Sequence, residues 1–556
     1  MIEELTPQVL AISIVLILLS APFVTAVISA ICLWLYRRAV VRAMSATSQS
    51  HPVRKPIADS SASDQAIQNP KVDTRQRTKC AYHSALESPK RDALQHAIAV
   101  FIAAVPLSLA AQIVYPSGLG AIGVFIGVWV YSWASVPMLL LVLPYSRLKT
   151  LAIVAFYFLV YGLLCVYATS VGNIPALQFG GVDVSERSGA TPVRMVLLWL
   201  IANGVPTLLC TLCFNRKLRA VAPSVLALVS LMITGLWFSW LWVWSPSGET
   251  AMGILSETLN VNLQGTGVMV AVIIFVTLAV ASRYIVGAIA RAYRHKSISD
   301  RFLSLIAIFI VFLTMYTMWL TVGGLHWISM MPISIFIYWL VLRLFYRRAS
   351  YLEESYALCF LRVFALGGLT QELLDSLAKY WRNIGNIQMI TGPDVATSTV
   401  QPHQFLDFLS GDLKRHFISN EGDLDSVVAQ MNQPRDRDGR FRINNLFCYE
   451  NTWQMALRPM VSDGARVLMD LRRFSEENSG CREELNFLAA EIPFRQCLII
   501  VDQTTDHIFL KRSVQDALDS LTPNACNTSK SFSELRQVEF APGDDNVRLL
   551  LECLLK

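Results

Sequence analysis

The chain contains a series of apolar stretches, each long enough to cross a lipid bilayer as a helix. A helix needs roughly 20 consecutive apolar residues to span the hydrocarbon core. Hydrophobic residues make up 54% of the chain and charged residues 16%, which is far from the average of a soluble protein. We therefore expect an α-helical polytopic membrane domain of about nine transmembrane helices in contact with a lipid bilayer. The stretches are Gln8–Tyr36, Leu94–Tyr115, Leu119–Pro144, Leu151–Ser170, Met195–Phe214, Val221–Trp244, Gly267–Ile289, Phe302–Val322 and Leu325–Tyr346.

Basic residues between these stretches predict the orientation of the chain. Cytoplasmic loops carry an excess of Lys and Arg. The two long loops expected outside, 171–194 and 245–266, contain only two basic residues, Arg187 and Arg194. We therefore expect the N-terminus outside and the C-terminal domain in the cytoplasm. The loops expected inside contain Arg37, Arg38, Arg42, Arg147, Lys149, Arg216, Lys217, Arg219, Arg291, Arg294, Lys296, Arg301, Arg347 and Arg348.

Composition divides the chain into four regions. Residues 1–42 hold the first transmembrane helix, and 93–348 hold the other eight. Residues 43–92 are rich in Ser, Gln, Lys, Asp and Pro, with too few aliphatic residues to form a core, so we expect a disordered cytoplasmic linker. Residues 351–556 form a separate cytoplasmic domain. The spacing Gly123 to Gly127 permits close helix packing, either within the chain or in a homo-oligomer.

Several function classes are disfavoured. The spans contain no charged residue near the expected bilayer midplane, where a transporter usually needs one. The net charge of +6 is modest and the basic residues lie between apolar stretches, which argues against nucleic-acid binding. The eleven cysteines show no paired spacing in the expected loops, which argues against a metal site.

Short apolar runs alternate with amphipathic stretches in the C-terminal region. We expect strands separated by helices, with an insertion carrying helices at Gln404–His416 and Leu424–Met431. This alternation predicts an α/β domain of flavodoxin-like order, with a mostly parallel sheet covered on both faces. The expected strands are Leu358–Phe364, Ile387–Ile390, Val467–Leu471, Gln496–Val501 and Leu535–Phe540. The expected helices are Thr370–Ile384, Thr452–Arg458, Cys481–Glu491, Leu510–Leu521 and Val547–Leu555.

Candidate site residues lie where strands end in this domain, because open α/β sheets bind ligands at that edge. Glu484 lies in the first turns of a helix and is either a catalytic carboxylate or a solvated helix residue. Asp470 ends a strand and either orients a ribose hydroxyl or caps the following turn. Gly367 and Gly368 follow the first strand and either let a phosphate approach the backbone or form a simple turn.

The segment Tyr449–Leu485 resembles the centre of Toll/interleukin receptor (TIR) domains. It contains Trp453 in a short helix, the apolar strand Val467–Leu471, and a helix that begins with Cys481, Glu484 and Leu485 in a Cys-x-x-Glu-Leu pattern. The stretch is also similar to nucleoside deoxyribosyltransferases, whose pattern Asp470, Gly480 and Glu484 fit. Enzymatic members of both families use the matching Glu at an N-glycosidic bond. The resemblance implies NAD or a related nucleotide as substrate, without a cofactor, and a bacterial inner membrane.

Two functions remain open. The first is a membrane-tethered glycohydrolase that cleaves NAD or a nucleotide in a signalling or defence role. Its chemistry needs a carboxylate, because the ribosyl carbon becomes cation-like as the base departs. The second is a signalling scaffold without catalytic activity, in which the TIR-like domain self-associates and Glu484 is structural.

Overall fold

The computed structural model of the chain consists of two compact units. The helical unit contains Met1–Trp34 and Lys90–Ala349, and the α/β unit contains Leu35–Pro89 and Ser350–Lys556. The residues outside the description are 1–6, 48–73, 117–119, 144–146, 172–195, 198, 215–217, 219–220, 244, 349–355, 364–367, 392–399, 401, 412, 414–416, 419–421, 426–427, 429–434, 450–451, 462–464, 524, 529, 531 and 542.

The helical unit contains eight helices that are long and apolar enough to cross a membrane, counted over the described residues. The expected span at Met195–Phe214 is not among them; its described part is the π-helix Leu200–Gly204 followed directly by the helix Val205–Phe214, and residues 195 and 198 lie outside the description. The elements are α1 (Pro7–Thr47), α2 (Thr74–Val114), α3 (Ala121–Tyr131), α4 (Ser135–Val142), α5 (Arg147–Val171), η2 (Leu200–Gly204), α7 (Val205–Phe214), α8 (Ala222–Val243), α9 (Pro246–Leu259), α10 (Leu263–Arg294), α11 (Asp300–Leu320), η3 (Thr321–Gly323), η4 (Leu325–Ser329) and α12 (Met330–Arg348).

Helix α11 forms the centre of the helical unit. Its side chains from Leu305 to Leu320 are buried on every side, as its apolar sequence dictates. The two buried threonine hydroxyls in its second half donate to the helix's own backbone, Thr314 to Ile310 at 2.9 Å and Thr317 to Leu313 at 2.7 Å. The buried hydroxyl of Tyr316 instead donates to Asn203 Oδ1, outside the helix, at 2.6 Å.

Small residues allow close packing between α2 and α3. A Cβ added at Gly127 would lie 2.2 Å from the Ser108 Oγ, so only glycine fits at this position. The Ser108 hydroxyl donates to the Val124 carbonyl at 2.7 Å. The glycine spacing noted in the sequence therefore serves packing within the chain at Gly127.

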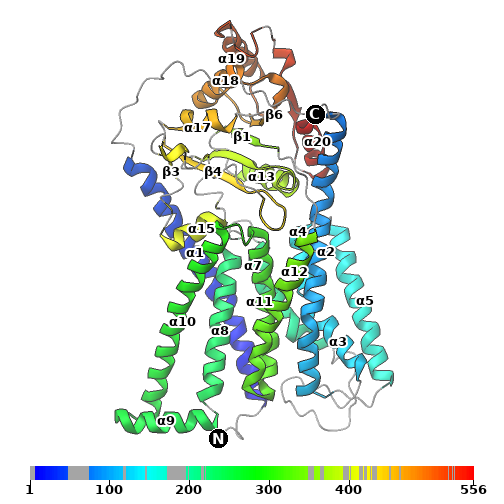
Figure 1. The fold of residues 1–556 in the computed structure, drawn as a ribbon, viewed down its shortest axis with the longest axis vertical. Helices are drawn as coiled ribbons and strands as arrows, with labels where there is room; N and C mark the ends of the chain where they lie inside the picture. Colours follow the sequence, from blue (N-terminus) through cyan, green and yellow to red (C-terminus); the bar gives the residue numbers. More distant parts are fainter. Residues whose placement is uncertain are drawn as a thin grey trace. The chain divides into compact units, whose positions relative to one another are not determined.

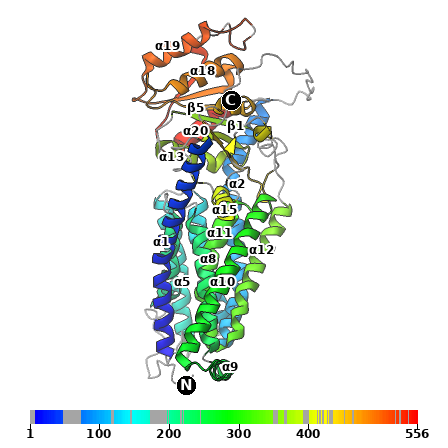
Figure 2. The ribbon, with the colours of Figure 1, turned by 90° about the vertical axis from the view of Figure 1, so that its left-hand side faces the viewer.

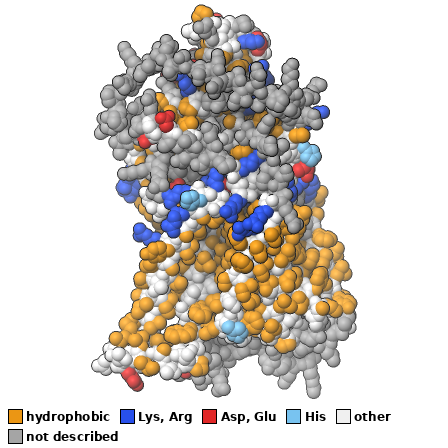
Figure 3. Space-filling model, viewed as in Figure 1, with side chains coloured by type: hydrophobic (Ala, Val, Ile, Leu, Met, Phe, Trp, Pro, Cys, Tyr) orange, Lys and Arg blue, Asp and Glu red, His pale blue; other side chains and the backbone are white. Residues whose placement is uncertain are grey.

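The surface of the helical unit agrees with insertion into a membrane. Hydrophobic side chains cover much of the surface of the helical unit that is visible in Figure 3, and Lys and Arg side chains gather at one end of this apolar surface. Helix α9 lies across the ends of α8 and α10, in the stretch expected as an outer loop (Figure 1). Ile254 of α9 and Leu263 of α10 are exposed there.

The α/β unit is built on a seven-stranded sheet in which every pairing is parallel. The order is β3-β4-β2-β1-β5-β6-β7. Within it, β2-β1-β5-β6-β7 follows the expected flavodoxin-like order, and β3 and β4 extend the sheet beyond β2. The strands are β1 (Leu358–Arg362), β2 (Ile387–Thr391), β3 (Phe417–Ile418), β4 (Ile443–Cys448), β5 (Arg466–Asp470), β6 (Cys497–Val501) and β7 (Arg536–Glu539).

Helices cover both faces of this sheet, as the α/β prediction requires (Figures 1 and 2). Helices α17 (Trp453–Met460), α18 (Ser479–Glu491) and α19 (His507–Asp519) pack on one face with Cys359, Leu361 and Val467. Helices α13 (Gly368–Trp381) and α20 (Asp544–Leu555) pack on the other with Leu358 and Phe360. Helix α15 is shorter than expected, Pro402–Ser410.

Part of the expected disordered linker is ordered. Helix α1 continues to Thr47 and helix α2 begins at Thr74, so 43–47 and 74–92 are helical, while 48–73 lie outside the described residues. Ala81 and Ala85 of this helix are buried in the core that α13 and α20 form with the sheet. The Asn383 Nδ2 donates to the Ala85 carbonyl at 3.4 Å. Two alanines four residues apart form an apolar stripe too narrow to stand out in a polar sequence.

Candidate functional site at the carboxyl edge of the sheet

The chain changes direction across the sheet between β1 and β5. From β1 it continues to β2 on one side, and it later returns to place β5 on the other. Ligands of open α/β sheets bind outside the carboxyl ends of the strands at such a reversal. Arg362 ends β1 and Asp470 ends β5, and the two residues are direct partners in the ladder. The topology therefore brings a buried cation and a buried carboxylate together at the expected site.

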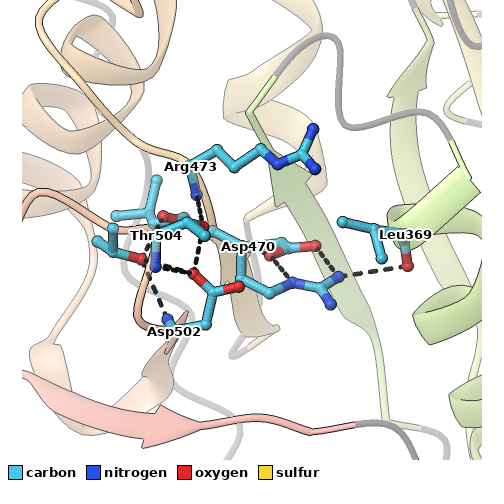
Figure 4. A network of polar contacts seen from close by, with 8 residues as sticks. Leu369, Asp470, Arg473, Asp502 and Thr504 are labelled. Atoms are coloured by element: carbon cyan, nitrogen blue, oxygen red, sulfur yellow. Dashed lines mark hydrogen bonds and ion pairs between the residues drawn. The ribbon is translucent and has the colours of Figure 1, made fainter.

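Asp470 forms an ion pair with Arg472. The Arg472 Nε donates to one carboxylate oxygen at 2.8 Å and Nη2 donates to the other at 2.7 Å. The same Nη2 donates to the Leu369 carbonyl at 3.3 Å, and the guanidinium lies 5.7 Å from the centre of the Phe540 ring. Both oxygens of Asp470 thus accept hydrogen bonds from Arg472 in this structure (Figure 4). The assignment of Asp470 to a ribose hydroxyl remains a prediction.

The loops that follow β5 and β6 are joined by hydrogen bonds (Figure 4). The Thr504 backbone N–H donates to Asp502 Oδ1 at 2.9 Å, and the Arg473 N–H donates to the Thr504 hydroxyl at 3.1 Å. The Thr505 hydroxyl donates to the Leu471 carbonyl at 3.0 Å. Arg473 adopts a left-handed backbone with φ of 59°, which turns the chain sharply after the ion pair. These contacts hold the polar edge in one arrangement.

Glu484 lies on the buried face of helix α18 and is not a solvated helix residue. Only 3% of its surface is exposed, and its neighbours Cys481 and Leu485 belong to the core on that face of the sheet. Burial raises the pKa of Glu484 to about 8, and the charge of Arg362 opposes this rise. Its Oε2 has no hydrogen-bond partner among the described residues. At neutral pH the carboxyl group therefore carries a proton.

The adjacent Glu483 occupies a different environment. It is exposed, and its Oε2 accepts a hydrogen bond from Gln454 Nε2 at 2.7 Å. Since the two residues are consecutive and chemically identical, the fold alone gives them different environments. Glu483 is therefore a matched control for any experiment on Glu484.

The glycine pair is described in part. Gly368 is the first residue of α13, whereas Gly367 lies outside the described residues. The sequence reasoning missed two threonines and two arginines at this edge. Thr370 of α13 and Thr391 at the end of β2 are 1% and 0% exposed, and neither hydroxyl has a hydrogen-bond partner among the described residues. Arg362 and Arg472 are also buried. These residues come from separate elements, so no local motif marks them.

No group of three or more His, Cys, Asp or Glu side chains in the described part of the chain is arranged to hold a metal ion. No family model matches the chain, and neither a curated protein nor a solved structure shows significant similarity to it. Two features of the chain therefore bear on its function: the geometry of the carboxyl edge and the resemblance of Tyr449–Leu485.

Proposed function

We propose that this is a multi-pass membrane protein whose cytoplasmic TIR-like domain cleaves the N-glycosidic bond of NAD or a related nucleotide, with Glu484 as the catalytic residue. The observation that carries the proposal is the environment of Glu484. A buried carboxyl group with an unpartnered oxygen costs stability, and such groups are enriched at functional sites. It lies on the helix that follows β5, the strand at the reversal of the sheet.

The protonated state of Glu484 suits a particular sequence of proton transfers. As the bond from the ribosyl carbon to the base breaks, its electron pair goes to the base nitrogen, and Glu484 donates its proton there. The carboxylate that remains then stabilises the ribosyl cation. Water adds to the ribosyl carbon and returns a proton to Glu484. Nicotinamide leaves NAD as a neutral molecule without this proton, so cleavage of NAD requires Glu484 to ionise first.

The helical unit supports the membrane part of the proposal. Its eight apolar helices and its apolar surface fit a bilayer. The basic residues at one end of that surface fit a cytoplasmic side under the positive-inside rule. In this orientation the N-terminus is outside and the α/β unit is in the cytoplasm.

The decisive experiment measures base release by the purified full-length protein in detergent. NAD and purine nucleosides are incubated separately with the wild type and with the Glu484→Gln and Glu483→Gln variants. We expect Glu484→Gln to lose activity by about a few hundredfold, because the variant has neither a proton to donate nor a charge to leave behind. Glu483→Gln should retain activity. If the wild type releases no base, or if both folded variants lose activity equally, the proposal is wrong.

A second candidate is a signalling scaffold without catalytic activity. Two observations favour it: Glu484 is almost completely shielded from solvent, and both oxygens of Asp470 accept hydrogen bonds from Arg472. In that case the carboxyl group is a structural feature of the core. Self-association of the full-length protein without any base release would support the scaffold.

A further inference from the structure

We propose that the carboxyl edge of the sheet contains an oxyanion site, formed by Thr370, Thr391 and Arg362, that holds a phosphate group of the nucleotide. This inference rests on the proposed function and names the chemical class that the site would bind. It assigns binding roles to residues on the face of the sheet opposite Glu484. Its evidence is the convergence of unpartnered hydroxyls and positive charge at one place.

The sheet register puts the side chains of Arg362 and Thr391 on one face. Side chains alternate between faces along a strand, so Arg362 shares a face with Leu358 and Phe360, and Thr391 shares one with Ile387 and Met389. Those four apolar residues all belong to the core that α13 covers. Arg362 and Thr391 end the adjacent strands β1 and β2. They therefore point towards the α13 side at the same edge.

Thr370 approaches this edge from the helix. Buried positions along α13 include Thr370, Leu373, Leu374 and Leu377, spaced as one helical face. The three leucines pack on the same core as β1 and β2, so this face is turned towards the sheet. Thr370 lies in the first turn of the helix, and the Leu369 carbonyl of that turn accepts from Arg472. The first turn is thus held at the carboxyl edge, and the Thr370 hydroxyl faces the strand ends.

Guanidinium groups and backbone N–H donors lie at this edge. Arg362 and Arg472 contribute two positive charges; Asp470 pairs with Arg472, and Asp502 and Glu372 also interact with the charge of Arg472. The N-terminus of the 14-residue helix α13 adds partial positive charge and backbone N–H groups. A buried hydroxyl without a partner is unfavourable unless a ligand accepts a hydrogen bond from it. Phosphate oxygens are acceptors only, and they match both hydroxyls and the guanidinium.

The test measures binding of pyrophosphate, ADP and adenosine to the full-length protein in detergent by calorimetry. Thr370→Val and Thr391→Val keep the side-chain shape and remove only hydroxyls that have no protein partner, so both variants should fold. Ser513→Ala is the matched control. Ser513 is 2% exposed and its hydroxyl is likewise without a partner among the described residues, but it lies on α19, on the other face of the sheet.

We expect the wild type to bind pyrophosphate and ADP but not adenosine, because adenosine lacks the phosphate. Each threonine variant should bind pyrophosphate about tenfold more weakly, as the loss of a hydrogen bond to a charged group implies. Ser513→Ala should bind as the wild type does. If the wild type binds neither pyrophosphate nor ADP, or if the threonine variants bind them unchanged, the oxyanion site is wrong.

The same proteins separate this inference from the proposed function. Release of base without pyrophosphate binding would remove the oxyanion site and leave the glycosidase in place. Threonine-dependent pyrophosphate binding without any base release would establish the anion site and remove the catalytic role of Glu484.

Discussion

Each unit of the protein contains a buried ion pair, and the two pairs are built differently. In the helical unit, Arg301 Nη1 at the start of α11 lies 2.5 Å from Asp92 Oδ2 on α2, and 209 positions separate the residues. In the α/β unit, Arg472 pairs with Asp470, two positions earlier. Side-chain exposure is at most 8% in either pair. Burial is therefore similar, and the difference lies in what each pair connects.

A pair between distant positions fixes the packing of two helices. A pair between residues two positions apart forms whenever the chain turns at that point, so it contributes little to the choice of fold. The local pair instead positions Arg472 against the Leu369 carbonyl and the Phe540 ring. We infer that the pair in the helical unit serves the fold and that the pair in the α/β unit serves the site.

The largest effect should come from breaking the distant pair. Asp92→Asn leaves the buried Arg301 without its charge partner, and we expect a loss of about 3–5 kcal/mol in the free energy of unfolding. Asp470→Asn should cost about half as much, because Arg472 retains the Leu369 carbonyl and the Phe540 ring. Thermal unfolding of the two variants in detergent gives the comparison. The variant Asp92→Asn combined with Arg301→Gln is the control and should recover part of the loss.

Equal losses for Asp92→Asn and Asp470→Asn would contradict the distinction between a fold pair and a site pair. A loss of stability in Asp470→Asn alone would mean that the pair in the α/β unit serves the fold and the pair in the helical unit does not. Pyrophosphate binding adds a second measurement, because Asp470→Asn removes the negative charge beside the proposed oxyanion site and should strengthen binding.

The next effect is a pH dependence that belongs to the α/β unit. Burial raises the pKa of Glu484 to about 8 in the folded protein, from 4.5 for an ordinary glutamate. Between these values the folded protein binds more protons than the unfolded chain, so the free energy of unfolding falls as pH rises. Glu484→Gln has no proton to lose. Relative to the wild type, the variant should gain on the order of 5 kcal/mol between pH 4 and pH 9.

Chemical unfolding across this pH range measures the difference, and Glu483→Gln is the control. Glu483 is exposed, so its variant should follow the wild-type profile. Parallel profiles for the wild type and Glu484→Gln would show that the carboxyl group ionises without penalty in the folded protein. Its burial would then have no electrostatic consequence.

The two units also differ in how far the sequence predicts them. Long apolar runs marked most of the helices, because a helix surrounded by lipid or by other apolar helices has no polar face. The run Met195–Phe214 stays a prediction as a span: its described part is the π-helix Leu200–Gly204 followed directly by the helix Val205–Phe214, and residues 195 and 198 lie outside the described part of the chain. In the α/β unit, strand β4 was missed because Asn444 and Asn445 interrupt its apolar run. Pairing with β2 forms that strand despite the local sequence.

The candidate site divides in the same way. Glu484 and Asp470 were predicted as site residues because a strand, a loop and a helix form one continuous motif. The burial of Glu484 and the ion pair of Asp470 were not predicted, since both depend on side chains packed in three dimensions. Arg362, Thr370 and Thr391 became candidates only through the register of β1 and β2 and the buried face of α13.

The smallest expected effect comes from the helix caps, and it sharpens the comparison of burial. Ser299 caps α11 by accepting from the Phe302 N–H at 3.0 Å, and Asp506 caps α19 by accepting from the Phe509 N–H at 2.9 Å. Ser299 is 3% exposed, so Ser299→Ala leaves a backbone donor that water cannot reach. Asp506 is exposed, so water replaces its carboxylate in Asp506→Ala.

We expect Ser299→Ala to cost about 2 kcal/mol and Asp506→Ala about 0.5 kcal/mol, the two ends of the range for lost caps. Unfolding of each variant measures the cost, and the controls Ser299→Thr and Asp506→Asn retain an oxygen that accepts the same hydrogen bond. The reverse order would mean that the charge of Asp506 at the N-terminus of α19 outweighs the burial of Ser299. In that case burial would not explain the strength of the cap at Ser299 relative to the cap at Asp506.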